Sequence, residues 1–213
     1  MTTTTDLLHL TQWLSPAFPV SGFAYSHGLE TAISAGQVSC GQTLTAWLEA
    51  ILRFGSGHTD AVLLSLSHRT CLPDVDLADL AAALATSSER WDETRLQGAA
   101  FAQTVSALRT EPVAPAALPV VVGIAARDLG LPTHTVVALY LQGFAANLVQ
   151  VGVRFVPLGQ TEGQMVLSAL LPIIAEIAET SATAGTGDLG NAAFGSDLAA
   201  MAHETQDVRI FRS

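Results

Sequence analysis

Two residue pairs have the spacing of metal ligands or of a catalytic dyad on a helix. His27 and Glu30 lie three positions apart, and so do His68 and Cys71. Residues three apart share one face of a helix, so each pair could touch one metal ion. A local hydrogen bond or a buried cysteine explains the same spacing. A small metal-dependent hydrolase that uses these four residues stays an alternative, and convergence of three of them would favour it.

The rest of the sequence offers little for catalysis. It has no Gly-x-Ser-x-Gly elbow, no lysine-containing phosphate loop and no His-Glu-x-x-His motif. All nine basic residues are Arg, so a Schiff-base lysine is excluded. His203 and Glu204 are adjacent, so their side chains diverge on a helix and a metal pair is not expected there. We expect a protein that is not an enzyme, with no catalytic residue, no metal ligands and no tightly bound cofactor.

The composition is typical of a helical protein. Of 213 residues, 49% are hydrophobic and 13% are charged, which excludes a disordered chain. Counts of 34 Ala and 29 Leu exceed those of 17 Val and 7 Ile, as helices favour. The net charge of −10 argues against a general phosphate-binding surface, so we expect no nucleic-acid partner.

The cysteines and the apolar stretches bear on the compartment. Cys40 and Cys71 are too few for a disulfide framework and suggest a reducing compartment. The first residues lack a basic region ahead of an apolar run, so we expect no secretory signal and a cytoplasmic protein. Residues 129–153 contain no charged residue and could span a bilayer. Their Gly, Pro, His and amide side chains favour a buried core helix, with a membrane protein as a further alternative.

Hydrophobic spacing and helix breakers predict how these residues are positioned. The expected fold is all-α, a single-domain bundle of about ten helices over residues 1–213, with no strand. Residues 181–195 are rich in Gly, Ser and Thr, and we expect them to be flexible. The principal helices are expected at 6–14, 24–35, 44–52, 60–68, 77–85, 86–108, 120–129, 137–155, 161–179 and 197–203, with capping boxes at 86–89 and 161–164.

One predicted helix carries a regular apolar seam. Its residues are spaced 4, 3, 4 and 3 apart, the pattern of a helix that packs against another helix. We expect this seam to join two copies in a homodimer, although Leu148 could instead pack inside one chain. The seam consists of Val137, Leu141, Phe144, Leu148 and Val151.

Two segments look suited to binding a partner. Residues 16–30 concentrate Phe18, Phe23 and Tyr25 between prolines and glycines. These rings either plug the end of the bundle or form a rigid docking surface. Residues 204–213 place Arg209 and Phe211 at the end of an acidic chain, which indicates a docking tail or a frayed terminus.

Four segments also carry a family resemblance. Residues 16–31 read Pro-Ala-Phe-Pro-Val-Ser-Gly-Phe-Ala-Tyr-Ser-His-Gly-Leu-Glu-Thr and resemble the N-terminal signature of the urease accessory protein F (UreF) family. Segments at 93–95, 155–164 and 201–213 resemble the same family in the same order. Together they cover the chain from about residue 7 to its end. Ser21 and Ala102 stand where the family pattern has Gly, and Asp207 replaces an aromatic residue of the tail.

The resemblance implies a function. It implies an all-α adaptor that forms a homodimer and binds the scaffold accessory protein D/H and the nickel-carrying GTPase G. In this family the assembly delivers nickel to apo-urease, so nickel is handled by the complex, and the F protein regulates the GTPase. Arg209 falls on the family's tail arginine, which contacts the GTPase side. The residues expected to bind partners are Phe18, Phe23, Tyr25, His27, Glu30, His203, Glu204, Arg209 and Phe211.

Overall fold

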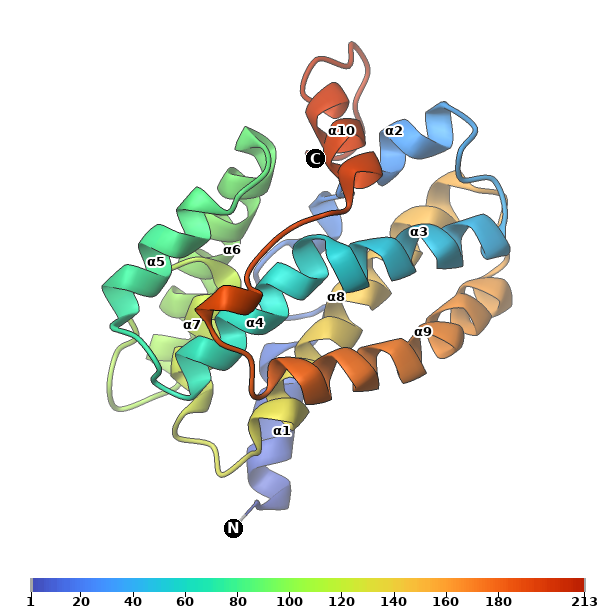
Figure 1. Ribbon diagram of the computed structural model, residues 1–213. Coiled ribbons are helices and arrows are strands. Elements are labelled where there is room, and N and C mark those ends of the chain that lie inside the picture. The colour runs from blue at the N-terminus through green and yellow to red at the C-terminus, as the bar shows by residue number, and fades with distance from the viewer. Residues whose placement is uncertain (1, 213) are drawn as a thin grey trace.

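The computed structural model describes residues 2–212 and is all-helical over that range (Figure 1). The described residues form ten α-helices and two short 3-10 helices, and they contain no strand. This confirms the predicted all-α fold class. The elements are α1 (Thr4–Trp13), η1 (Gly22–Ala24), α2 (Leu29–Ser34), α3 (Gly41–Phe54), α4 (Ser56–His68), α5 (Asp74–Ala83), α6 (Ser88–Ala107), α7 (Leu118–Ala126), α8 (Thr133–Phe155), α9 (Gln160–Ser181), η2 (Thr186–Asp188) and α10 (Phe194–His203).

Helix α4 forms the centre of the bundle. Its residues from Thr59 to Ser67 are all buried, as expected for a helix surrounded by other helices. It packs against α3, α5, α7, α8 and α9 (Figure 1). A Cβ at Gly123 of α7 would lie 2.7 Å from the Leu64 carbonyl oxygen, so glycine allows the two backbones to meet. The hydroxyl of Ser67 fixes this contact by donating to the Val120 carbonyl at 2.7 Å.

The seam residues of α8 lie inside the chain. Val137, Leu141, Leu148 and Val151 are buried in the main hydrophobic core, where α8 packs against α9 and α4. Phe144 is half-buried, and the centroid of its ring lies 4.9 Å from the centroid of the His27 imidazole. The seam therefore packs within one chain, which is the alternative that the sequence analysis gives for Leu148. A second copy would have to bind at another surface, and the homodimer stays a prediction.

Helices α8 and α9 are each long and apolar enough to cross a membrane by length and composition. Half of the most apolar window of α8 and 39% of that of α9 are buried within the chain. Core helices of soluble proteins have the same properties. These two helices are therefore weak evidence for a membrane protein.

Several predicted helix boundaries are wrong. The helix expected from residue 24 begins at Leu29, because His27 and Gly28 both have positive φ, at 51° and 74°, which no helix accommodates. Ser87 rather than Thr86 is the N-cap of α6. At α9 the N-cap is Gly159, so Thr161 lies inside the first turn and its predicted capping box does not form.

Residues 181–195 contain η2 and lie against the bundle. The backbone amide of Ala192 donates to the Phe54 carbonyl at 2.7 Å. The hydroxyl of Thr59 donates to the Gly190 carbonyl, and His58 lies within hydrogen-bond distance of the Asp188 carbonyl. These contacts connect the segment to α3 and α4, while its expected flexibility stays a prediction.

A glycine on α6 makes a close contact that can be tested. A Cβ at Gly98 would overlap the carbonyl oxygen of Ala116, in the backbone that leads into α7. We expect Gly98→Ala to lower the free energy of unfolding by about 1–3 kcal/mol, because the backbone must shift. Urea denaturation measures this. Gly195→Ala in α10 is the matched control, since Gly195 also lies within a helix and no atom lies within 4 Å of its added Cβ; an equal loss in both variants would contradict the contact.

Candidate functional site

Residues 14–28, which we call the aromatic loop, turn sharply at two points. Ser21 has φ of 58°, a left-handed conformation that favours glycine, and glycine is what the family pattern has there. His27 and Gly28 are also left-handed. A Cβ at Gly28 would lie 2.6 Å from the backbone nitrogen of Ala200, so this glycine lets α10 pack directly on the loop. The turn at 27–28 sends the side chains of His27 and Glu30 to different neighbours.

His27 points into a buried cluster of charges that we call the Arg90 cluster. The Arg90 guanidinium donates to both carboxylate oxygens of Asp60 at 2.7 Å and to Glu93 at 2.9 Å. The Tyr140 hydroxyl also donates to Asp60 at 2.7 Å. His27 Nε2 lies 3.1 Å from Glu93 Oε1, and Nδ1 lies 3.2 Å from the Ser56 hydroxyl. The cluster is formed by Asp60, Arg90, Glu93, Tyr140 and His27, and it ties the loop to α4, α6 and α8.

Opposite charges compensate one another inside this cluster. Burial on its own raises the pKa of Glu93, but the charges of His27 and Arg90 outweigh it and lower that pKa to about 2. Burial lowers the pKa of Arg90, and Asp60 and Glu93 more than reverse this, so the guanidinium stays charged. Burial, followed by the charge of Asp60, raises the pKa of Tyr140. The hydroxyl is therefore a permanent donor, and the cluster acts as a fixed support.

Glu30 belongs to a second cluster, the His203 cluster, which consists of Glu30, Glu89, His203 and Arg209. The His203 ring is fully buried between two carboxylates. Its Nδ1 lies 2.9 Å from Glu89 Oε2 and its Nε2 lies 3.1 Å from Glu30 Oε2. Arg209 Nη1 donates to the other oxygen of Glu89 at 2.6 Å. The cluster therefore joins α2, α6, α10 and the end of the chain.

The C-terminal tail, residues 204–212, folds back over this cluster. The backbone amides of Ile210 and Phe211 both donate to the Glu30 carboxylate at 3.0 Å. The Phe211 ring is buried and lies 5.1 Å from that of Phe155. The amide of Arg212 donates to the carbonyl of Ala24 in the aromatic loop at 2.8 Å. The two segments that the sequence analysis singled out thus lie side by side.

Glu204 connects the tail to the start of α6. Its Oε1 accepts hydrogen bonds from the Ser88 amide at 3.0 Å, the Ser88 hydroxyl at 2.7 Å and the Glu89 amide at 3.3 Å. The hydrogen bond from the Ser88 hydroxyl is the main reason that the pKa of Glu204 is lowered. A carboxylate at a helix N-terminus also interacts favourably with the helix dipole. Glu204 therefore completes the capping of the helix that carries Glu89 and Arg90.

Most residues predicted to bind partners are buried within the chain. Phe18 packs against Phe101, with ring centroids 5.4 Å apart. It therefore plugs the bundle, which is one of the two alternatives that the sequence analysis gives for these rings. Tyr25 is also buried, and His27, Glu30, His203 and Phe211 have the intrachain partners given above. Phe23 and Arg209 are exposed and can be reached by a partner. Partner binding itself stays a prediction for all nine residues.

The four residues of the hydrolase alternative do not converge. His27 and Glu30 belong to separate clusters, while His68 Nδ1 lies 3.0 Å from the Thr133 hydroxyl at the far end of α4. Burial lowers the pKa of His68. Cys71 is exposed. Within residues 2–212 no three His, Cys, Asp or Glu side chains are placed to hold a metal ion.

Sequence reasoning missed the centre of the site. The sequence pattern places Asp60 only at the start of the helix predicted over 60–68, and it singles out neither Arg90 nor Tyr140. The spacing of Arg90 and Glu93, three apart on a helix, was the available signal for an ion pair. Residues 185–190 read Gly-Thr-Gly-Asp-Leu-Gly, the spacing of a dinucleotide fingerprint. They enclose η2 and follow a helix rather than a strand, so they lack the context of that motif.

The Arg90 cluster makes a stability prediction. We expect Arg90→Ala to lower the free energy of unfolding by about 3–5 kcal/mol, because it leaves Asp60 and Glu93 buried without their cation. Arg95→Ala on the same helix removes an exposed pair with Asp92 and should cost about 0–1 kcal/mol. Urea denaturation of both variants measures the difference. Equal costs for the two arginines would show that the buried cluster does not support the fold.

Comparison with known proteins places this arrangement in a family. A family model for UreF matches residues 38–171. The urease accessory protein UreF of Cereibacter sphaeroides is 58% identical over 207 residues, which cover 97% of this chain and 98% of that protein. The UreF of Dinoroseobacter shibae is 52% identical over 206 residues, with 97% and 98% covered. The expected resemblance is confirmed: the chain belongs to the UreF family of urease accessory proteins.

Proposed function

We propose that this chain is a cytoplasmic adaptor in urease maturation, not an enzyme. It assembles with the scaffold accessory protein D/H and the nickel-carrying GTPase G, and the complex delivers nickel to apo-urease. Membership of a family of accessory proteins supports this proposal. The observation that carries it is the arrangement of α10 and the docked tail, which present one apolar and one charged surface at the same end of the molecule. Self-association into a homodimer belongs to the same proposal.

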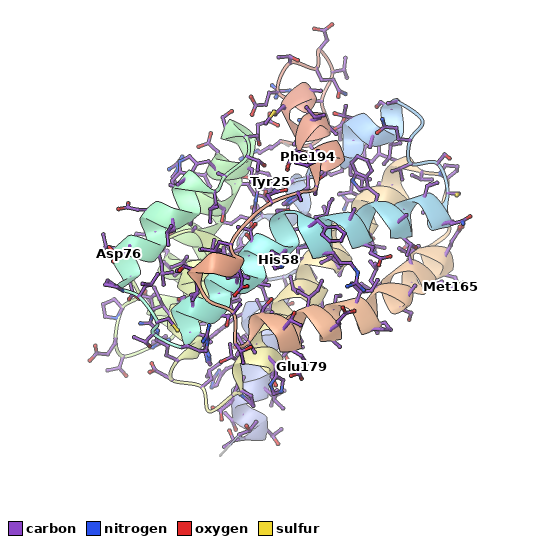
Figure 2. The ribbon with its side chains drawn as sticks, in the orientation of Figure 1. Tyr25, His58, Asp76, Met165, Glu179 and Phe194 are labelled. Carbon is purple, nitrogen blue, oxygen red and sulfur yellow. The ribbon has the colours of Figure 1, made fainter. Side chains whose placement is uncertain are left out.

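The apolar surface is a stripe on α10. Phe194, Leu198 and Met201 are spaced 4 and 3 apart and are 72%, 66% and 46% exposed. This spacing places them on one helix face, and three such neighbours are typical of a binding surface rather than of isolated exposed residues. Helix α10 packs on α2 at one end of the bundle, and Phe194 lies at its start (Figures 1 and 2). The exposed residues Val208 and Ile210 of the tail add further apolar side chains.

The two surfaces suit partners of different kinds. Stable interfaces are more apolar than transient ones, so we assign the α10 stripe to the scaffold protein. A GTPase that binds and leaves during a cycle suits the charged surface around Arg209, where electrostatics govern association. Glu89 holds that guanidinium on the chain's own surface. Part of the arginine therefore remains available to an acidic partner.

A pull-down tests the assignment of Arg209. We expect Arg209→Ala to keep the fold and the scaffold interaction but to weaken capture of the GTPase about 30- to 1000-fold, the usual range for an interface arginine. Leu198→Ser should show the reverse pattern. Arg53→Ala is the control, because Arg53 pairs with Glu49 and Glu176 on α3 and α9. If Arg209→Ala melts like the wild type and recruits the GTPase at full affinity, the assignment of the tail is wrong.

Nickel is expected to be cargo of the complex. Within residues 2–212 no three His, Cys, Asp or Glu side chains are placed so that they could hold a metal ion. We therefore expect the isolated chain to bind Ni²⁺ weakly at most. Isothermal titration calorimetry of the isolated chain with a nickel salt measures this. A tight, stoichiometric nickel site on this chain alone would contradict the prediction and would assign the adaptor a direct role in carrying the ion.

A further inference from the structure

A cavity of about 70 Å³ lies beneath the aromatic loop, between α1, α6 and α8. The Arg90 cluster lines one side of it, and much of the remaining wall is apolar, with side chains such as those of Trp13, Phe101 and Leu148. The ring of Phe23 in η1 also lines the cavity and is 59% exposed, so the cavity reaches the surface beside η1. The proposed adaptor function makes no use of this space.

The orientation of one amide in the cavity wall is fixed by its neighbour. Gln97 Nε2 donates to Glu93 Oε1 at 3.0 Å. The Glu93 carboxylate is paired with Arg90, and as an ionised group it only accepts hydrogen bonds. The nitrogen of the Gln97 amide must therefore face Glu93, and its oxygen must face away. Gln97 is 5% exposed, and no donor among residues 2–212 reaches its Oε1, which leaves a buried acceptor unsatisfied.

Two further polar groups line the same cavity. Tyr25 is 5% exposed, and its hydroxyl bonds to no side chain or backbone group among the described residues. The amide of Asn147 on α8 has no such partner either, and a Cβ at Gly22 would lie 2.9 Å from its Nδ2, so the loop packs directly on this side chain. Packing seals off neither these two groups nor the Gln97 oxygen, so all three open onto the cavity.

The electrostatics of the cavity favour an uncharged guest. The ionisable side chains of the Arg90 cluster that line it already bond to one another. An ionic guest would bring a charge without a partner against apolar walls, and burying such a charge is costly. The cavity therefore selects against ions and in favour of a neutral molecule with hydrogen-bonding groups.

The size of the cavity limits the guest to a few atoms. Its volume of about 70 Å³ compares with about 150 Å³ for an apolar cavity that holds benzene, so a guest of about four non-hydrogen atoms fits. The guest needs a donor for Gln97, an acceptor for Tyr25 or Asn147, and flat faces that pack against aromatic rings. A primary amide or a urea meets all three requirements, whereas a small alcohol has no flat face.

We propose that this cavity is a binding site for a small uncharged amide of the size of acetamide or urea. The N–H of the guest donates to Gln97 Oε1, and its carbonyl oxygen accepts from Tyr25 or Asn147. The bound molecule contacts the aromatic loop, α6 and α8 at once and so strengthens the hold on the loop. The inference does not rest on the proposed adaptor function, because binding by the isolated chain holds or fails whichever partners the chain has.

An NMR titration of the isolated, ¹⁵N-labelled chain with acetamide tests the proposal. We expect the backbone amide signals of Tyr25, Gln97 and Asn147 to shift in a saturable way. The expected dissociation constant is about 0.1–10 mM, because so small a guest has little binding energy available. The amide of Met165, an exposed residue of α9, is the control for unspecific binding and should not shift.

Two molecules of the same shape separate the requirements. Acetone has the carbonyl group of acetamide but no N–H for Gln97, and acetate has the same shape but carries a charge. We expect both to bind at least about tenfold more weakly than acetamide. Urea, added at concentrations far below those that denature proteins, should bind about as tightly as acetamide.

Gln97→Leu is the matched variant, because it removes the acceptor and nearly keeps the volume of the side chain. We expect its affinity for acetamide to fall about 5- to 10-fold and its affinity for acetone not to fall. Gln164→Leu, the same substitution at an exposed position of α9, should bind acetamide like the wild type. The Leu141 amide signal in the core of α8 shows whether each variant is folded.

Three results with the wild-type chain would overturn the proposal. They are the absence of saturable shifts up to about 50 mM acetamide, shifts at Met165 as large as those at the cavity, and acetone or acetate bound as tightly as acetamide. A folded Gln97→Leu variant with wild-type affinity for acetamide would overturn it as well. Because the first three results come from the unmodified chain, an unstable variant cannot leave the proposal undecided.

Discussion

The guanidinium of Arg90 lies in the interior between Asp60 and Glu93, and a charge in that position must be fully compensated. Its partners come from α4 and α6, and through Tyr140 and His27 the cluster extends to α8 and the aromatic loop. Four segments that are far apart in the sequence are thereby held in one arrangement. Apolar packing alone tolerates small shifts, whereas a buried ion pair with several hydrogen bonds fixes distances and directions. The position of the loop follows from this constraint.

The tail depends on the loop in turn. Because the chain turns at His27 and Gly28, Glu30 points toward α10 and the C terminus rather than toward the Arg90 cluster. It then binds His203 and two tail amides, while Gly28 allows α10 to pack closely. The exposed surfaces of α10 and Arg209 are therefore placed by buried residues of the loop. Residues in this family signature can matter for assembly without touching a partner.

The sequence predicts the helices well and the site poorly, for a physical reason. Helices such as α3 follow from local hydrophobic spacing and breakers, which a single segment contains. The seam of α8 shows the limit, since its spacing predicts helix packing but does not say whether the partner is α9 or another copy. The contacts of Glu30 with His203 and Phe211 span more than 170 residues, and no local pattern encodes them. The resemblance identifies the aromatic loop and the C-terminal tail as segments of interest, but the contacts between them form only in the folded chain.

A double-mutant cycle between Glu30 and His203 tests most directly whether these buried contacts connect the loop to α10. The free energies of unfolding of Glu30→Gln, His203→Gln and the double variant are compared with that of the wild type. If the pair is coupled as described, the loss in the double variant will be smaller than the sum of the single losses by at least about 1 kcal/mol. Additivity within about 0.5 kcal/mol would contradict the account, because it would mean that the two side chains do not stabilise each other.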